Sequence, residues 1–256
     1  MATKPPPHVL DRWLQSTATK IGVHRLYEVA ERPGTRAKLI DEVRELVRGH
    51  YGSADVIAKR LSELGAKKTA ALIAEQLPRT KKARSGDAGE ILATELAERE
   101  LGFEVPIRRL RWKDGREMAL RGDDVLGVAR GPKNALRLLK GESKSRAVLA
   151  SGVIEEAGAA LDRAGGRPTR HTVLFVADRL REMKEDDLAL ELERSVLASF
   201  SGVEVEHLIF VLCGNDPGQM LTTHLASSTA KKRRRHAIGV HLPDHAKAIS
   251  SLFKDP

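Results

Sequence analysis

The sequence contains a single cysteine, few aromatic residues and no long apolar run. Cys213 is the only cysteine among 256 residues, which excludes an intrachain disulfide and a zinc site made of several cysteines. We expect it to be a buried thiol at the end of a strand. Aromatic residues make up 4% of the chain, which argues against aromatic stacking as the main way of binding nucleic-acid bases.

No segment has the character of a membrane span or a signal peptide. No apolar run approaches the roughly 18 residues that a membrane helix needs. The segment 1–10 contains three prolines and lacks the apolar centre of a signal peptide. We therefore expect a cytoplasmic protein without a membrane partner.

The charge balance favours a polyanionic partner. Lysine and arginine total 44 against 35 aspartates and glutamates, a formal net charge of +9. Basic side chains that neutralise phosphates release counterions, so nucleic acid is the partner that this balance favours. Hydrophobic residues make up 41% of the chain, enough for a core that must be mainly aliphatic.

The N-terminal third is predicted to be a small helical module, residues 1–80. Residues 1–8 are expected to be disordered, and the pattern from 11 to 76 is interpreted as helical. Within it, apolar residues recur at helical spacing from Leu39 to Val47, followed by Gly49 as a stop. Further helices are predicted over 54–64 and 67–76, and the basic run 78–86 is interpreted as a connector.

From residue 81 to 256 the pattern indicates a second domain in which strands and helices alternate. That alternation predicts an α/β fold, with a mixed central sheet covered by helices on both faces. Strands are predicted over 125–129, 135–144, 171–177, 205–213 and 236–242. Helices are predicted over 87–100, 151–163, 184–200 and 244–253.

Three residues stand out as candidates for chemistry: Asp124, Glu142 and Lys144. Asp124 directly precedes an apolar strand, and Glu142-Ser143-Lys144 ends the next one. Alternate residues of a strand point to one face, so Glu142 and Lys144 share a face. A hairpin between the two strands would bring Asp124 close to Glu142.

This combination suits metal-assisted hydrolysis of a phosphodiester. Mg²⁺ prefers oxygen ligands and usually takes only one or two protein carboxylates. Bound metal lowers the pKa of a water molecule and polarises the phosphoryl group. A lysine beside it can stabilise the anionic transition state or act on the attacking water.

Asp124 and Glu142-Ser143-Lys144, with Glu90 on an upstream helix, resemble the PD-(D/E)XK nuclease superfamily. Its order of helix, strand, strand, helix, strand is matched by the segments predicted over 87–100, 125–129, 136–144, 151–163 and 171–177. Asp123 stands where the superfamily often has proline. The resemblance implies a restriction-endonuclease-like core in the second domain.

Three motifs are similar to those of HamA-type nuclease subunits of Hachiman anti-phage defence. They are Ser85-Gly86-Asp87-Ala88-Gly89-Glu90-Ile91-Leu92, Gly122-Asp123-Asp124-Val125-Leu126-Gly127 and Gly141-Glu142-Ser143-Lys144. This resemblance implies a DNA nuclease that works with a superfamily 2 helicase. It also implies that Asp124 and Glu142 hold Mg²⁺, or Mn²⁺ in its place, that Glu90 completes the metal site or orients a metal-bound water, and that Lys144 is catalytic.

Several of these residues have competing structural interpretations. Glu90 fits a capping box that begins at Asp87, in which it would close the start of a helix. Asp123 is interpreted as a turn residue rather than a metal ligand. Glu155 and Glu156, on the helix that follows Lys144, are interpreted as solvated or paired charges rather than catalytic groups.

Two other functions remain open at this point. A site-specific restriction endonuclease would share the same motifs. A non-catalytic basic module that binds nucleic acid or a protein would need none of the acidic residues for chemistry.

Overall fold

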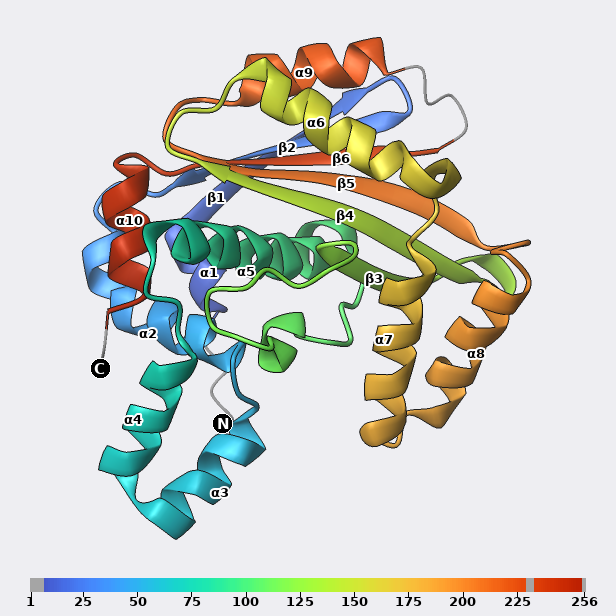
Figure 1. Ribbon diagram of the computed structural model, residues 1–256. Helices are drawn as coiled ribbons and strands as arrows, with labels where there is room; N and C mark the ends of the chain where they lie inside the picture. The colour runs from blue at the N-terminus through green and yellow to red at the C-terminus, as the bar shows by residue number, and fades with distance from the viewer. Residues whose placement is uncertain (1–6, 229–232, 255–256) are drawn as a thin grey trace, which may run out of the picture.

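The computed structural model describes residues 7–228 and 233–254, and a mixed six-stranded sheet lies at their centre (Figure 1). The strand order is β1-β2-β6-β5-β4-β3. The outer pairs β1–β2 and β3–β4 are antiparallel, whereas β2, β6, β5 and β4 run parallel. The strands are β1 (Leu14–Ile21), β2 (His24–Glu31), β3 (Val125–Arg130), β4 (Leu136–Arg146), β5 (Glu204–Cys213) and β6 (Arg235–His241).

Helices cover both faces of this sheet, so the expected α/β fold with a mixed central sheet is confirmed. The N-terminal helices are α1 (Val9–Trp13), α2 (Arg36–Gly49), α3 (Ala54–Leu64), α4 (Ala66–Gln76) and α5 (Lys81–Leu101). The later ones are α6 (Ser151–Asp162), α7 (Arg170–Glu182), α8 (Asp186–Leu197), α9 (Gly218–Ser227) and α10 (His245–Leu252). None of the helices in the described ranges is both long and apolar enough to cross a membrane.

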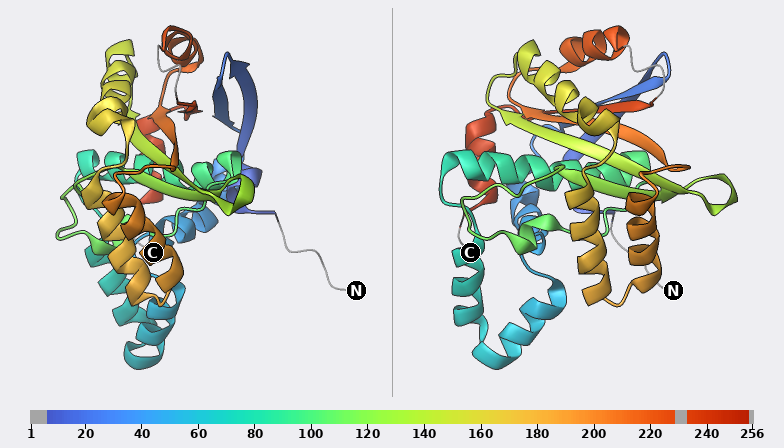
Figure 2. Two further views of the ribbon diagram at one scale, coloured as in Figure 1. Left: turned by 90° about the vertical axis from the view of Figure 1, so that its right-hand side faces the viewer. Right: turned by 45° about the vertical axis from the view of Figure 1, so that its right-hand side comes forward.

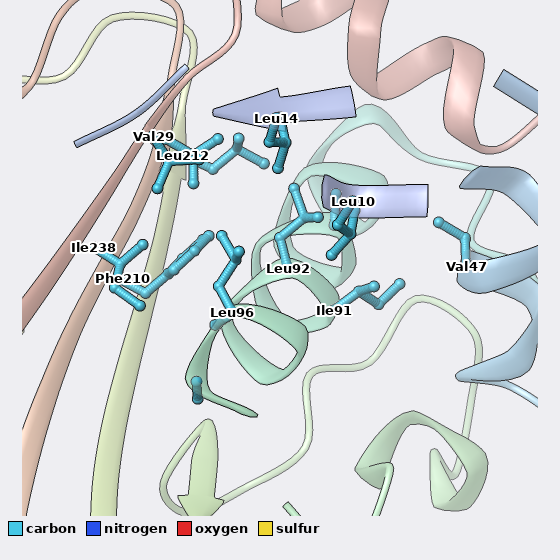
Figure 3. Packing of buried hydrophobic residues seen from close by; sticks show 14 of the residues in the cluster. Leu10, Leu14, Val29, Val47, Ile91, Leu92, Leu96, Phe210, Leu212 and Ile238 are labelled. Atoms are coloured by element: carbon cyan, nitrogen blue, oxygen red, sulfur yellow. The ribbon is translucent and has the colours of Figure 1, made fainter. Parts of the chain in front are cut away.

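The long helix α5 lies across one face of the sheet, and α6 and α9 lie on the other (Figure 1). Figure 3 shows Leu92 and Leu96 of α5 beside Phe210 of β5 and Ile238 of β6. Alternate residues of β5 point the other way and pack with Ile154 of α6. The hairpins α3–α4 and α7–α8 both project away from the sheet (Figure 2). Helix α7 shares a buried cluster with Leu126 and Leu138, whereas α5 packs with Val125 and Leu139 of the same two strands, so α5 and α7 cover opposite faces.

The helical interpretation holds for residues 11–13, which lie in α1, but it is wrong for residues 14–31, which form the hairpin β1–β2. All but the first and last residues of β1 are exposed, so its sequence carries no apolar alternation that would identify a strand. Its partner β2 pairs with β6, more than 200 residues away. The sheet therefore includes strands from both sides of the boundary expected at residue 80, and the boundary itself stays a prediction.

The strand predicted over 171–177 is also wrong, because these residues lie in α7. Val173, Val176, Ala177 and Leu180 are buried at helical spacing, and Thr169 caps the helix by accepting from the Thr172 backbone N–H. A short apolar run does not by itself distinguish a strand from a buried helix face. The strand that follows α6 in the sheet is β5 rather than 171–177.

Helix α5 begins at Lys81, six residues before the predicted start at Asp87. Thr80 is its N-cap and accepts from the Ala83 backbone N–H at 3.3 Å. The basic run interpreted as a connector therefore forms the first turns of α5, and the capping-box interpretation of Glu90 is wrong. The remaining predicted helices and strands agree with the structure within a few residues.

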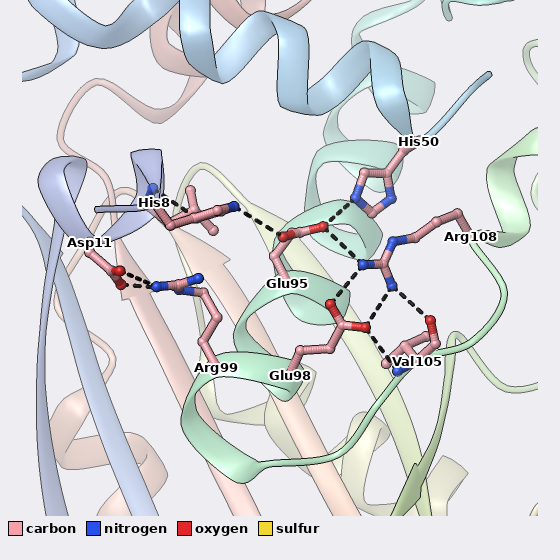
Figure 4. Close-up of polar contacts among 9 residues, drawn as sticks. His8, Asp11, His50, Glu95, Glu98, Arg99, Val105 and Arg108 are labelled. Carbon is pink, nitrogen blue, oxygen red and sulfur yellow. Dashed lines mark hydrogen bonds and ion pairs between the residues drawn. The ribbon is translucent and has the colours of Figure 1, made fainter. Parts of the chain in front are cut away.

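Polar contacts hold α5 to the N-terminal segment (Figure 4). The Glu95 carboxylate accepts from His50 Nε2 at 2.8 Å, and Arg99 pairs with Asp11. His8, which caps α1, lies 3.9 Å from Glu95. Of the segment expected to be disordered, residues 1–6 lie outside the described ranges.

Candidate active site

The pairing of β3 with β4 brings Asp124 to Glu142. Val125 lies opposite Gly141 in the antiparallel register, so the residue before Val125 lies next to the residue after Gly141. The Asp124 Oδ2 atom accepts a hydrogen bond from the Ser143 backbone N–H at 2.8 Å. The proximity expected from a hairpin is therefore present.

Glu142 and Lys144 lie together on one face of β4. Lys144 Nζ is 2.9 Å from Glu142 Oε1 and also 2.9 Å from Glu156 Oε1 on α6. Burial alone would lower the pKa of Lys144, but its hydrogen bonds to the two glutamates outweigh burial and raise that pKa. Lys144 is therefore held as a cation, and Glu156 is paired with it rather than merely solvated.

Glu90 reaches the same cavity from the third turn of α5. The helix passes very close to β4 at Gly89, where an added Cβ would lie 2.8 Å from Ser143 Oγ and 3.3 Å from Ser145 Cβ. A glycine at this position allows the close approach. Glu90, Asp124, Glu142 and Lys144 therefore all line one cavity.

Two carboxylates of this group, those of Asp124 and Glu90, are harder to ionise than ordinary ones. Burial, followed by the nearby Glu142, raises the pKa of Asp124 to about 6. Burial, together with Asp124 and Asp87, raises the pKa of Glu90 to about 8, against the opposing effect of Arg109. Negative charges gathered in a low-dielectric site favour the binding of a cation.

Asp123 is held away from this group by contacts on all sides. Its carboxylate accepts from the Thr169 backbone N–H at 2.7 Å and lies 3.7 Å from Nζ of the buried Lys140. Its backbone N–H donates to Thr172 Oγ1 at 2.9 Å, and its carbonyl accepts from Arg109. These contacts favour the interpretation of Asp123 as a structural residue that fixes the chain before Asp124.

Two basic residues near the site were missed by sequence reasoning. Arg109 is buried and donates to the carbonyls of Arg121 and Asp123, so it supports the loop that carries Asp124. Lys113 Nζ donates to Asp87 Oδ2 at 2.8 Å beside the cavity. Both come from the irregular segment between α5 and β3, where no periodicity marks them.

The cavity has a volume of about 1110 Å³ and opens between α5, the end of β4 and α10. Within the described ranges, no group of three or more histidine, cysteine, aspartate or glutamate side chains is arranged to enclose a metal ion. Mg²⁺ does not need one, because it commonly binds one or two carboxylates and completes its shell with water and phosphate. The oxygen donors of Asp124 and Glu142 suit such a hard cation.

Comparison with known proteins identifies the family. The family model for HamA matches residues 7–255. The chain belongs to the HamA family. It is 29% identical over 253 residues to Hachiman protein HamA from Bacillus cereus, an alignment that covers 94% of this chain and 88% of that protein. The resemblance seen in the three HamA-type motifs is thus confirmed, and membership of this family supports a role in Hachiman defence.

Proposed function

We propose that this chain is a metal-dependent nuclease that hydrolyses DNA phosphodiester bonds as the effector subunit of an anti-phage defence system. The observation that carries the proposal is the meeting of Asp124, Glu142 and Lys144 in one cavity. Two carboxylates beside a lysine suit metal-assisted hydrolysis of a phosphodiester bond.

Each residue has a role that follows from its surroundings. Asp124 and Glu142 supply carboxylate oxygens to Mg²⁺, which when bound lowers the pKa of a water molecule and shields the charge of the phosphoryl group. Lys144, whose pKa is raised by its hydrogen bonds, stabilises negative charge on the reacting phosphate. Glu90, with a pKa of about 8, can hold a proton near neutral pH.

The helicase partner belongs to the same proposal. The Bacillus cereus relative is named as a Hachiman protein, and the resemblance implies that a superfamily 2 helicase accompanies it. A nuclease that acts on the DNA of its own cell is harmful unless it is restrained. We therefore expect cleavage by this chain to differ between the isolated protein and its complex with the helicase.

The test is a digest of plasmid DNA with Mg²⁺ or Mn²⁺, using the isolated chain and the complex. We expect progressive degradation that EDTA stops. Glu142→Gln and Lys144→Ala should each reduce the cleavage rate by about 100-fold or more, the scale seen when a group that stabilises the transition state is removed. Discrete bands in place of a smear would favour a site-specific endonuclease.

A matched control is Glu155→Gln on α6, an exposed glutamate that does not line the cavity. It should cut DNA at the unmodified rate. Full cleavage by folded Glu142→Gln protein would overturn the nuclease proposal and leave a non-catalytic binding module as the alternative.

A further inference from the structure

The cavity that holds the carboxylates also has a cationic wall, which we define as Lys81, Lys82, Arg84, Arg146 and Lys247. The first three lie in the opening turns of α5, Arg146 ends β4, and Lys247 lies on α10. All five line the cavity, and the two lysines of α5 and Arg146 are exposed. Their side chains are therefore available to a ligand.

Little within the described ranges neutralises these charges. Lys81 and Lys82 make no ion pair there, and Lys247 only approaches Asp244 at 4.0 Å on the surface. Arg84 donates to the Pro78 carbonyl at 2.9 Å, and Arg146 to the Ser145 carbonyl at 2.9 Å. A carbonyl orients a guanidinium without cancelling its charge, so the wall carries a net positive potential.

The other cations of the cavity behave differently. Lys113 is bound to Asp87, Lys144 to Glu142, and Arg79 to Glu75. Lys113 and Lys144, which lie beside the acidic group, are thus paired, whereas four of the five cations of the cationic wall make no ion pair within the described ranges. The cavity is therefore divided into an acidic part, where a metal-assisted reaction could occur, and a part whose cations are mostly unpaired among the described residues.

A chain of hydrogen bonds fixes the three elements that carry the wall. Ser85 Oγ on α5 lies 2.8 Å from Ser145 Oγ on β4, which lies 2.9 Å from His245 Nε2 on α10. Burial lowers the pKa of His245, so the link is between neutral groups. Because Ser145 follows Lys144 directly, these hydrogen bonds hold the cationic wall at a constant distance from Lys144.

The start of α5 adds little to this potential. The Glu117 carboxylate accepts from the backbone N–H groups of Arg79 and Thr80 and from Thr80 Oγ1, so it offsets the partial positive charge of the helix start. The positive potential therefore rests on the five side chains of the cationic wall.

We propose that the cationic wall binds the sugar-phosphate backbone of a nucleic-acid strand and seats the phosphates next to the one that reacts. This inference rests on the proposed nuclease function and assigns its substrate-binding residues. A cavity of about 1110 Å³ exceeds the range of about 300–1,000 Å³ typical of small-molecule pockets. Cations from three separate elements suit successive phosphates of a strand better than one small anion.

The test uses the salt dependence of DNA binding by the full chain. A fluorescein-labelled single-stranded DNA is titrated by anisotropy at several KCl concentrations, with EDTA present so that no strand is cut. Lys81→Gln/Lys82→Gln and Arg146→Gln should each weaken binding roughly 5- to 10-fold at 0.1 M salt for every phosphate that the variant no longer neutralises. They should also reduce the slope of log K against log salt by about 0.7 for each of these phosphates.

The matched control is Lys20→Gln/Lys38→Gln, two exposed lysines on β1 and α2 outside the cavity. It should keep the slope of the unmodified chain. Equal slopes for the wall variants and this control would overturn the proposal, provided thermal unfolding shows that the wall variants are folded. Because the titration needs no cleavage, that result is separate from a failure of the nuclease assay.

Discussion

Buried histidines make the stability of this protein depend on pH. His207, next to Arg235 and with Nε2 at 2.8 Å from the Gly166 carbonyl, is almost completely buried. Burial, opposed by that hydrogen bond and assisted by the Arg235 charge, lowers its pKa to about 4. The folded state therefore keeps His207 neutral in a pH range where the unfolded chain binds a proton.

We predict that the free energy of unfolding falls as the pH drops from about 6.5 toward 4, and that His207→Gln flattens this dependence. The unfolded histidine is protonated below about 6.5, so between the two pKa values the proton favours unfolding by up to about 1.4 kcal/mol per pH unit. Urea denaturation at pH 7.5 and 5.5 measures the effect.

The exposed His171 offers the control for this measurement. His171→Gln should keep the pH dependence of the unmodified chain. An equal drop in stability in the His207→Gln protein and the unmodified chain would show that His207 does not contribute.

Residue types and spacing were enough to locate the candidate site. Asp124, Glu142 and Lys144 could be selected because strand alternation and one hairpin suffice to bring them together. Cys213, expected to be a buried strand-end thiol, is the last residue of β5 and is fully buried, which raises its pKa to about 12. Glu156 and Arg109 could not be found this way, since packing alone places them beside the site.

At the scale of elements, the close contact between β3 and β4 constrains the site. A Cβ added to Gly141 would lie 2.7 Å from Val125 Cβ, so a larger residue must push the strands apart. These two residues directly adjoin Glu142 and Asp124. The separation of the carboxylates therefore depends on a glycine at position 141.

We predict that Gly141→Ala destabilises the fold by about 1–3 kcal/mol, the usual cost of overpacking, and also reduces DNA cleavage. Urea denaturation and a plasmid digest measure the two effects. Gly152→Ala on α6 is the control, because no atom lies within 4 Å of its added Cβ. Unchanged stability and cleavage in Gly141→Ala would mean that the strand pair tolerates the extra atom.

Elements with strong local signals were predicted well, and those without were not. The apolar residues of α2 recur at helical spacing, and β5 and β6 are continuous apolar runs. Each of these elements can therefore be predicted from its own sequence. The start of α5 was misplaced because Asp87-Ala88-Gly89-Glu90 satisfies the capping-box pattern, while Thr80 provides the actual cap. Propensity is a weak guide when two caps compete within one helical segment.

At the scale of the whole molecule, the N-terminal segment completes the sheet. Strand β2 pairs with β6 along six residues, and Leu10, Trp13 and Tyr27 are buried in the same core cluster as Phe210. Removing this segment would expose the edge of β6 and the apolar surface of α5. The two halves of the chain are therefore expected to depend on each other.

We predict that a fragment of residues 81–256 does not fold on its own. The loss of a paired strand and of several buried aromatic and aliphatic side chains exceeds the stability of a typical domain. Circular dichroism during heating should show no cooperative transition. A fragment that unfolds cooperatively and cuts DNA would instead support a domain boundary at residue 80.

The sequence by itself determined the residues of the candidate site, the α/β class and most of the helices and strands, because these depend on short-range periodicity and spacing. Only the tertiary structure decided that residues 14–31 are strands, that 171–177 belong to a helix and that Glu156 pairs with Lys144. The reason is physical. The exposed edge strand β1 satisfies its backbone hydrogen bonds by pairing with β2, and β2 in turn pairs with β6, more than 200 residues away. The local sequence of β1 carries no signal of these contacts.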